Sequence, residues 1–274
     1  MHRPVPRYRT IDFESWTHTS IGVRAVSQWG SSHHSFPSMN EDNQVAIVSN
    51  SASPRARRRA LLEFAIAYAL IMLVIWTPRP IQKHLWWVAA AAVVIIAGLS
   101  FKGFKAMGFQ TKNLLRSLWI TGVALLLAAV AIIVAMQLHT LHLPAGGPVA
   151  FVKTYWAYAI WACVQQLLLQ GFFLPRFLML AKTERTAAFL AAGLFALAHL
   201  PNPILTPITL IWGITACFIF LRFRNLYPLA MAHAIFGITI AITVPGPVVH
   251  NMRVGLGYLT YHQHPYYPAA LTKP

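Results

Sequence analysis

The sequence predicts an all-α protein, a polytopic transmembrane bundle of about seven helices with its N-terminus in the cytoplasm. Of the 274 residues, 57% are hydrophobic and only 10% are charged, whereas about a quarter of the residues in a soluble domain are charged. The apolar residues gather in blocks close to the roughly 20 residues that a helix needs to cross a bilayer. These observations predict a multi-pass protein of the cell's inner or plasma membrane.

The predicted helices follow one another along the chain. The first adjoins the polybasic run at residues 54–59, and the third ends just before His139 and His142. The second and fifth are short for a membrane crossing, so their ends are the least defined. In order, the predicted spans are residues 60–77, 85–101, 117–138, 154–174, 186–200, 204–221 and 227–244.

The formal net charge of +16 follows from the predicted topology. With the N-terminus inside, residues 1–60, 101–116, 175–185 and 222–226 face the cytoplasm and hold 17 of the 22 Lys and Arg residues. Cytoplasmic loops of membrane proteins are enriched in these residues. The basic excess therefore indicates orientation and contact with anionic lipid, and no nucleic-acid partner is expected.

Three glutamines interrupt the fourth predicted span. Gln166 and Gln170 are four residues apart and share a helix face, and Gln165 points about 100° away. A side-chain amide in hydrocarbon must find a hydrogen-bond partner, so such residues face the interior of a bundle. They either link neighbouring helices or belong to a polar site.

Among the 12 histidines, only His199 and His233 fall inside predicted helices away from their flanks. Together with the glutamines they suggest a polar site where three spans converge. Counted from the cytoplasmic ends, His199 lies about 20 Å and His233 about 10 Å into the membrane. A shared site therefore requires tilted or broken helices. Cys163 and Cys217 are assigned no function.

The order of these residues resembles that of a known family. Its first motif, E-E-x-x-x-R followed by a Gly-Phe stretch ending in Pro-Arg, is similar to QQLLLQGFFLPR at residues 165–176. Its second, F-x-x-x-H, is similar to FALAH at 195–199, and its third, H-x-x-x-N or H-x-x-x-D, matches HAIFG at 233–237 in the histidine only. The chain thus resembles the CPBP family of intramembrane metalloproteases, which includes CAAX proteases and bacteriocin-processing relatives.

The resemblance implies roles for particular positions. The glutamate that activates water in the family corresponds to Gln165, with Gln166 beside it, and Gln170 stands in place of the arginine. His199 and His233 are the implied ligands of zinc or another divalent metal, and Gly237 replaces the amide or acid of the third motif. The implied catalytic positions are Gln165, Gln166, Gln170, His199 and His233.

These departures alter the expected chemistry. A neutral amide cannot act as a base near pH 7, and general-base catalysis contributes about 10²–10⁴-fold to a rate. An amide is also a poorer zinc ligand than a carboxylate. Glu63 is the acid that could compensate, since it lies three residues into the first predicted helix. We expect its carboxylate to face the lipid headgroups. The alternative is that the carboxylate reaches the polar site formed by the glutamines and histidines.

The resemblance divides the chain into four parts. Residues 1–53 are expected to be a disordered cytoplasmic segment and 54–148 to form the N-terminal membrane helices. Residues 149–245 are the protease-like core, and 246–274 an irregular tail in which His262 and His264 form a weak candidate metal pair. No oligomeric state is predicted.

Two functions follow from this division. The first is an endopeptidase, possibly impaired, that cleaves membrane-associated peptides or proteins. The alternative is a non-catalytic relative that binds membrane peptides as an immunity or scaffold protein. A small transporter is less favoured, because the sequence has no evident inverted repeat. In either case the partners are the lipid bilayer and a membrane-associated peptide or protein.

Overall fold

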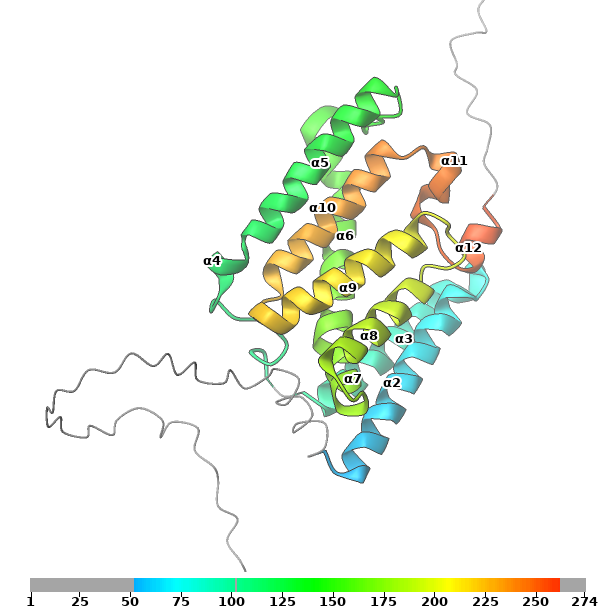
Figure 1. Ribbon diagram of the computed structural model, residues 1–274. Coiled ribbons are helices and arrows are strands. Elements are labelled where there is room, and N and C mark those ends of the chain that lie inside the picture. Colours follow the sequence, from blue (N-terminus) through cyan, green and yellow to red (C-terminus); the bar gives the residue numbers. More distant parts are fainter. Residues whose placement is uncertain (1–51, 102, 262–274) are drawn as a thin grey trace, which may run out of the picture. The chain divides into compact units, whose positions relative to one another are not determined.

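The computed structural model describes residues 52–101 and 103–261, which all belong to one unit of the fold. Within these residues the regular structure is entirely helical (Figure 1). The predicted disorder of residues 1–51 and the His262–His264 pair lie outside the described part. The helices are α2 (Pro54–Ile75), α3 (Arg79–Leu99), α4 (Leu114–Ser117), α5 (Trp119–Gln137), α6 (Gly147–Gln166), a π-helical stretch η1 (Leu167–Phe173), α7 (Leu174–Leu180), α8 (Glu184–Leu197), α9 (Leu205–Phe223), α10 (Tyr227–Thr243), α11 (Gly246–Val249), the short 3₁₀ helix η2 (His250–Met252) and α12 (Leu256–Leu259).

Each predicted span coincides with a helix of the bundle. Within the described residues, four helical segments are long and apolar enough to cross a membrane: Arg79–Leu99, Leu114–Gln137, Gly147–Leu180 and Leu205–Phe223. The apolar helix α10 is shorter than these. The crossing of the membrane by α2, α8 and α10, and the N-inside orientation, remain predictions.

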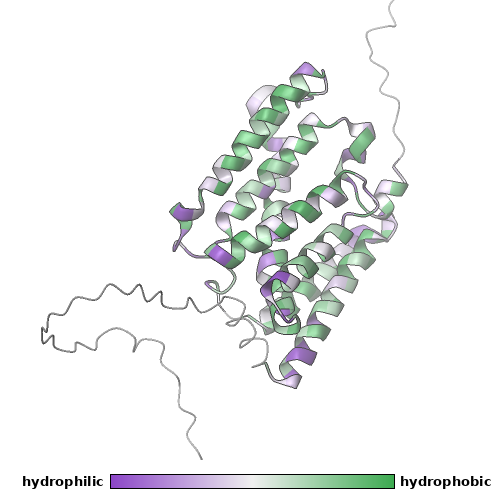
Figure 2. Cartoon of the chain, in the orientation of Figure 1, coloured by the Kyte–Doolittle hydropathy of each residue, from purple (hydrophilic) through white to green (hydrophobic). Residues whose placement is uncertain are grey.

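Many large apolar side chains are exposed on the helices, and Figure 2 shows hydrophobic residues along most of the length of the long helices. On α5, for example, Leu125 and Leu126 are 56% and 64% exposed. On α3, Val94 is 69% exposed. Contiguous exposed apolar surface of this kind is unusual on a soluble monomer and suits contact with lipid tails.

The first helix begins earlier than the apolar pattern predicts. The Ser53 hydroxyl accepts a hydrogen bond from the Ala56 amide at 3.2 Å, and Pro54 is the first helical residue. Both features favour a helix start at this point. The arginines of the polybasic run therefore lie on the first turns of α2, rather than in a flexible flank before it.

The fourth predicted span is part of a longer helical segment with a local irregularity. It starts at Gly147 and continues through the π-helical η1 into α7, which ends at Leu180. Pro175 lies at the start of α7. Proline lacks an amide hydrogen and clashes with the carbonyl four residues earlier, so widening the preceding turns accommodates it. The irregular turns contain Gln170, in the stretch that matches the first motif.

The helices pack so that the first motif lies at the centre of the bundle. Helix α10 packs against α5 and α6, α8 packs against α9, and α2 lies between α3 and α7 (Figure 1). Small residues allow α8 and α9 to approach closely, since a Cβ atom at Gly213 would lie 3.1 Å from the Ala192 Cβ atom. Membrane helices often use such small-residue contacts.

The segment after α10 is more ordered than the predicted tail. Residues 246–259 include α11, η2 and α12. The Asn202 amide donates hydrogen bonds to the carbonyls of Val249 and Arg253 at 2.9 and 3.0 Å. The Gly255 amide donates to the Leu200 carbonyl at 2.7 Å. These bonds attach residues 249–255 (the C-terminal turn) to the connection between α8 and α9.

Candidate functional site

A cavity of about 380 Å³ lies among α2, α6, η1, α8, α9, α10 and the C-terminal turn. Its wall is mostly apolar, and aromatic and aliphatic side chains such as Trp161, Phe195 and Phe236 contribute to it. This size and lining suit a site for a small molecule or a peptide side chain. The residues with polar atoms in the wall are Tyr68, Tyr158, Gln165, His199, Thr209, Trp212, His233 and Asn251.

The structure separates the three glutamines. Gln165 contributes to the cavity wall, whereas Gln166 and Gln170 are fully buried behind it. Gln170 Nε2 donates a hydrogen bond to Gln166 Oε1 at 3.3 Å, and Gln166 Nε2 lies 2.9 Å from His233 Nδ1. Gln166 and Gln170 therefore link α6 and η1 to α10, and one of the three candidate glutamines is available to a ligand.

His199 and His233 lie around one phenyl ring. The Phe195 ring centroid is 4.9 Å from that of His199 and 5.8 Å from that of His233. Both histidines are buried and contribute to the cavity wall. The difference in depth anticipated from the sequence does not keep them apart, because His199 follows the end of α8 in an irregular turn.

Hydrogen bonds fix different tautomers on the two imidazoles. His199 Nδ1 lies 2.7 Å from the Phe195 carbonyl oxygen, which can only accept. The proton of His199 is therefore on Nδ1, and Nε2 keeps a free electron pair. His233 Nδ1 faces the Gln166 NH₂ group, because Gln166 Oε1 already accepts from Gln170. With both amides oriented in this way, a neutral His233 carries its proton on Nε2.

The residues present do not fit a divalent metal. No cluster of three or more His, Cys, Asp or Glu side chains that could hold a metal ion occurs in residues 52–101 and 103–261. His199 and His233 stand among amides and aromatic rings, while structural and catalytic zinc sites use three or four anionic or imidazole ligands.

Tyr158 is a residue of the site that the sequence interpretation missed. A Cβ atom added to Gly237 would overlap the hydroxyl end of the Tyr158 side chain. The tyrosine thus fills the space that any larger residue at position 237 would need. Position 237 is four residues after His233, on the same face of α10. Tyr158 lies seven residues, or about two helical turns, before Gln165, and both contribute to the cavity wall. That spacing is the feature of the sequence from which Tyr158 could have been predicted to lie near Gln165.

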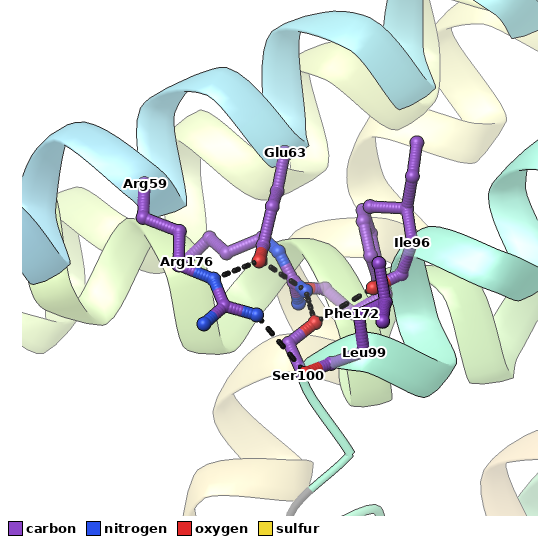
Figure 3. A network of polar contacts seen from close by, with 7 residues as sticks. All are labelled: Arg59, Glu63, Ile96, Leu99, Ser100, Phe172 and Arg176. Carbon is purple, nitrogen blue, oxygen red and sulfur yellow. Dashed lines mark hydrogen bonds and ion pairs between the residues drawn. The ribbon is translucent and has the colours of Figure 1, made fainter.

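Glu63 does not reach the cavity, which was the alternative considered for it. Its carboxylate pairs with Arg59 at 2.7 Å and with Arg176 at 2.8 Å (Figure 3), and it is not among the residues of the cavity wall. Its side chain is only 15% exposed, and its position relative to the lipid headgroups remains a prediction. The pairing with two guanidinium groups holds it at the junction of α2 and α7.

Arg176, at the start of the stretch predicted to face the cytoplasm, is a buried residue of α7. Its guanidinium donates to the Phe172 carbonyl at 2.7 Å and to Ser100 Oγ at 2.6 Å. It also lies over the Phe172 ring, 3.5 Å from the centroid. Figure 3 shows that this network joins α2, the end of α3 and α7.

The cavity offers neutral hydrogen-bonding groups. Its described wall contains hydroxyl, amide, indole and imidazole groups and no carboxylate. Such a wall can bind peptide N–H and C=O groups while the aromatic residues contact an apolar chain. Among the wall residues, His199 Nε2 is the group best suited to accept a proton from water.

Comparison with known proteins agrees with the family resemblance. Residues 147–239 match the family model described as "Type II CAAX prenyl endopeptidase Rce1-like". This segment runs from the start of α6 into α10, so the part of the chain that contains all five candidate residues is an Rce1-like domain. Searches among curated proteins and solved structures found no match.

Proposed function

We propose that this chain uses its Rce1-like domain to bind a membrane-associated peptide, or a lipid-modified chain end, without cleaving it efficiently. The observation that carries the proposal is the neutral cavity wall, which includes Gln165, the residue that the family resemblance aligns with the water-activating carboxylate. Loss of a positioned general base alone slows a reaction by about 10²–10⁴-fold. The cavity itself remains, so its capacity to bind is preserved.

The surrounding residues support loss of the base rather than its relocation. Glu63 is the carboxylate nearest in sequence to the membrane helices, and it is engaged by Arg59 and Arg176. Removing it from Arg176 would leave a buried guanidinium without its partner, which is costly. The hydrogen bond from Gln166 to His233 also gives a neutral replacement for the interaction that a carboxylate would make with that imidazole.

A second candidate is slow endopeptidase activity with His199 as the base. The bond from His199 Nδ1 to the Phe195 carbonyl leaves Nε2 free, and this observation favours it. In such a reaction Nε2 accepts a proton from water as the water oxygen adds to the scissile carbonyl carbon. The imidazolium then returns the proton to the departing amine as the C–N bond breaks. No carboxylate is needed.

Binding and turnover measured on one sample test both candidates. We would reconstitute the full chain in liposomes with a prenylated, fluorescent CAAX peptide, and record peptide retention and cleavage. The proposal predicts saturable binding with no turnover in the wild type, and loss of binding when Tyr158 and Gln165 are replaced by Phe and Leu. Cleavage that disappears in His199→Ala would establish the second candidate instead. Absence of saturable binding would refute both.

Glutamates introduced at positions 165 and 166 test whether the cavity retains the geometry needed for catalysis. The variant Gln165→Glu/Gln166→Glu should bind the peptide and gain turnover if only the base is missing. The matched control is Gln137→Glu, which places the same charge at the exposed end of α5. Turnover in the control would indicate a contaminating protease.

A further inference from the structure

A groove on the opposite side of α2 from the cavity combines arginines with apolar side chains. It lies between the N-terminal half of α2 and the last turns of α3, with a volume of about 520 Å³. Its lining residues are Arg55, Arg58, Arg59, Leu62, Glu63, Ile66, Ile96 and Leu99. None of these contributes to the cavity of the Rce1-like domain, so the groove is a separate feature.

The arrangement along α2 is polar at one end and apolar at the other. Arg55, Arg58 and Arg59 lie on the first two turns, and Leu62 and Ile66 continue the same face toward the middle of the helix. From Arg55 to Ile66 this face extends about 16 Å along the helix axis. Figure 2 shows the corresponding change from hydrophilic to hydrophobic along α2. Ile96 and Leu99 of α3 form the facing apolar wall.

Within residues 52–101 and 103–261, Glu63 is the one acidic residue that lines the groove, beside three arginines. Arg59 pairs with Glu63, which also pairs with Arg176 (Figure 3). Arg59 further donates to the Leu99 carbonyl at 3.0 Å, which fixes it between α2 and the end of α3. Arg55 and Arg58 are exposed, and within the described residues neither forms an ion pair.

We propose that this groove binds an anionic phospholipid. Its phosphate would lie between the guanidinium groups of Arg55 and Arg58, and an acyl chain would follow Leu62 and Ile66 along the wall formed by Ile96 and Leu99. Charge complementarity selects the headgroup, because guanidinium groups bind phosphate oxygens well. The apolar wall selects a lipid over a free phosphate. The proposal rests on the predicted insertion of the bundle in a membrane, and not on the proposed peptide binding.

Native mass spectrometry of the full chain, with phosphatidylglycerol and phosphatidylcholine of identical acyl chains, tests the proposal. We expect the wild type to retain phosphatidylglycerol preferentially. Arg55→Gln/Arg58→Gln should reduce that affinity by about five-fold for each charge removed. Both side chains are exposed, so the thermal unfolding of the variant should match the wild type. Glycerol 3-phosphate, which shares the headgroup chemistry but has no acyl chain, should not displace the lipid.

Arg116→Gln/Arg222→Gln is the matched control, because it removes two exposed arginines from other predicted cytoplasmic positions. It should retain the lipid preference. An equal loss in the control would mean diffuse attraction to the basic surface and would overturn the proposal. Displacement of the lipid by glycerol 3-phosphate would show that the groove recognises the phosphate alone, and would overturn the proposal of a lipid site. A gain of lipid binding in Glu41→Gln/Asp42→Asn, without any loss in Arg55→Gln/Arg58→Gln, would identify the N-terminal segment as the occupant instead.

Discussion

At the scale of single residues, the side chain at position 166 determines which nitrogen of His233 is protonated. The Gln166 amide donates to Nδ1, so the proton lies on Nε2. A carboxylate in the same place would accept from Nδ1–H and leave Nε2 with a free electron pair. One change from acid to amide therefore removes a charge and changes the tautomer that this hydrogen bond favours on His233.

Gln166→Glu should reverse this tautomer. Histidine-selective ¹⁵N NMR of the protein in detergent micelles would show the His233 proton move from Nε2 to Nδ1, while His199 keeps its proton on Nδ1. The control Gln137→Glu should leave both rings unchanged. An Nδ1 proton on His233 already present in the wild type would contradict the hydrogen-bond network described above.

Gly237 is required by the position of Tyr158. Gly237→Asn should destabilise the fold by about 1–3 kcal/mol, because the new side chain has no space beside the tyrosine. The same substitution in a Tyr158→Ala background should cost less, a non-additivity that unfolding in mixed micelles would measure. Gly193→Ala is the matched control, since a Cβ atom there meets nothing within 4 Å. Additive effects at 158 and 237 would refute the contact.

At the scale of helices, Glu63 attaches α2 to the Rce1-like domain through Arg176. This ion pair joins residues 113 positions apart, and its arginine side chain is only 8% exposed. The second pair, with Arg59, lies within α2 and its arginine is 60% exposed. The same carboxylate therefore allows a comparison of a buried and an exposed partner.

Glu63→Gln should lower the free energy of unfolding. Removing one member of a buried ion pair costs about 3–5 kcal/mol, and we expect a value near the lower end because the Glu63 carboxylate is partly exposed. Arg59→Gln should cost at most about 1 kcal/mol, as is usual for an exposed pair. Unfolding in mixed micelles with increasing SDS would measure both. Equal effects would show that the junction of α2 and α7 does not depend on Arg176.

The helices themselves were predictable because apolar blocks of the right length are visible in the sequence, while their ends and contacts were not. The cap at Ser53 and the widened turns before Pro175 are local features that apolar blocks do not reveal. The glutamines and histidines were found because polar side chains stand out in an apolar span. Tyr158 does not stand out there, and the pairing of Glu63 with Arg176 requires knowledge of which distant helices adjoin.

At the scale of the whole molecule, the orientation in the membrane is the main untested feature. It can be examined with single cysteines in a background in which Cys163 and Cys217 are replaced by Ala. A cysteine at Thr111 or Arg222, both of which are exposed, should react with a membrane-impermeant maleimide only from the cytoplasmic side. A cysteine at His142 should react only from outside. Labelling of all three from one side would refute the N-inside topology.

The hydrogen bonds that join the C-terminal turn to Asn202 and Leu200 have a practical consequence for work on this protein. Asn251, Met252 and Val254 form part of the cavity wall, so the cavity is completed by residues that follow the matched domain. A recombinant version truncated after α10 would retain every motif residue but would lack this part of the cavity wall. Affinity handles and fluorescent fusions are therefore better attached at the other terminus.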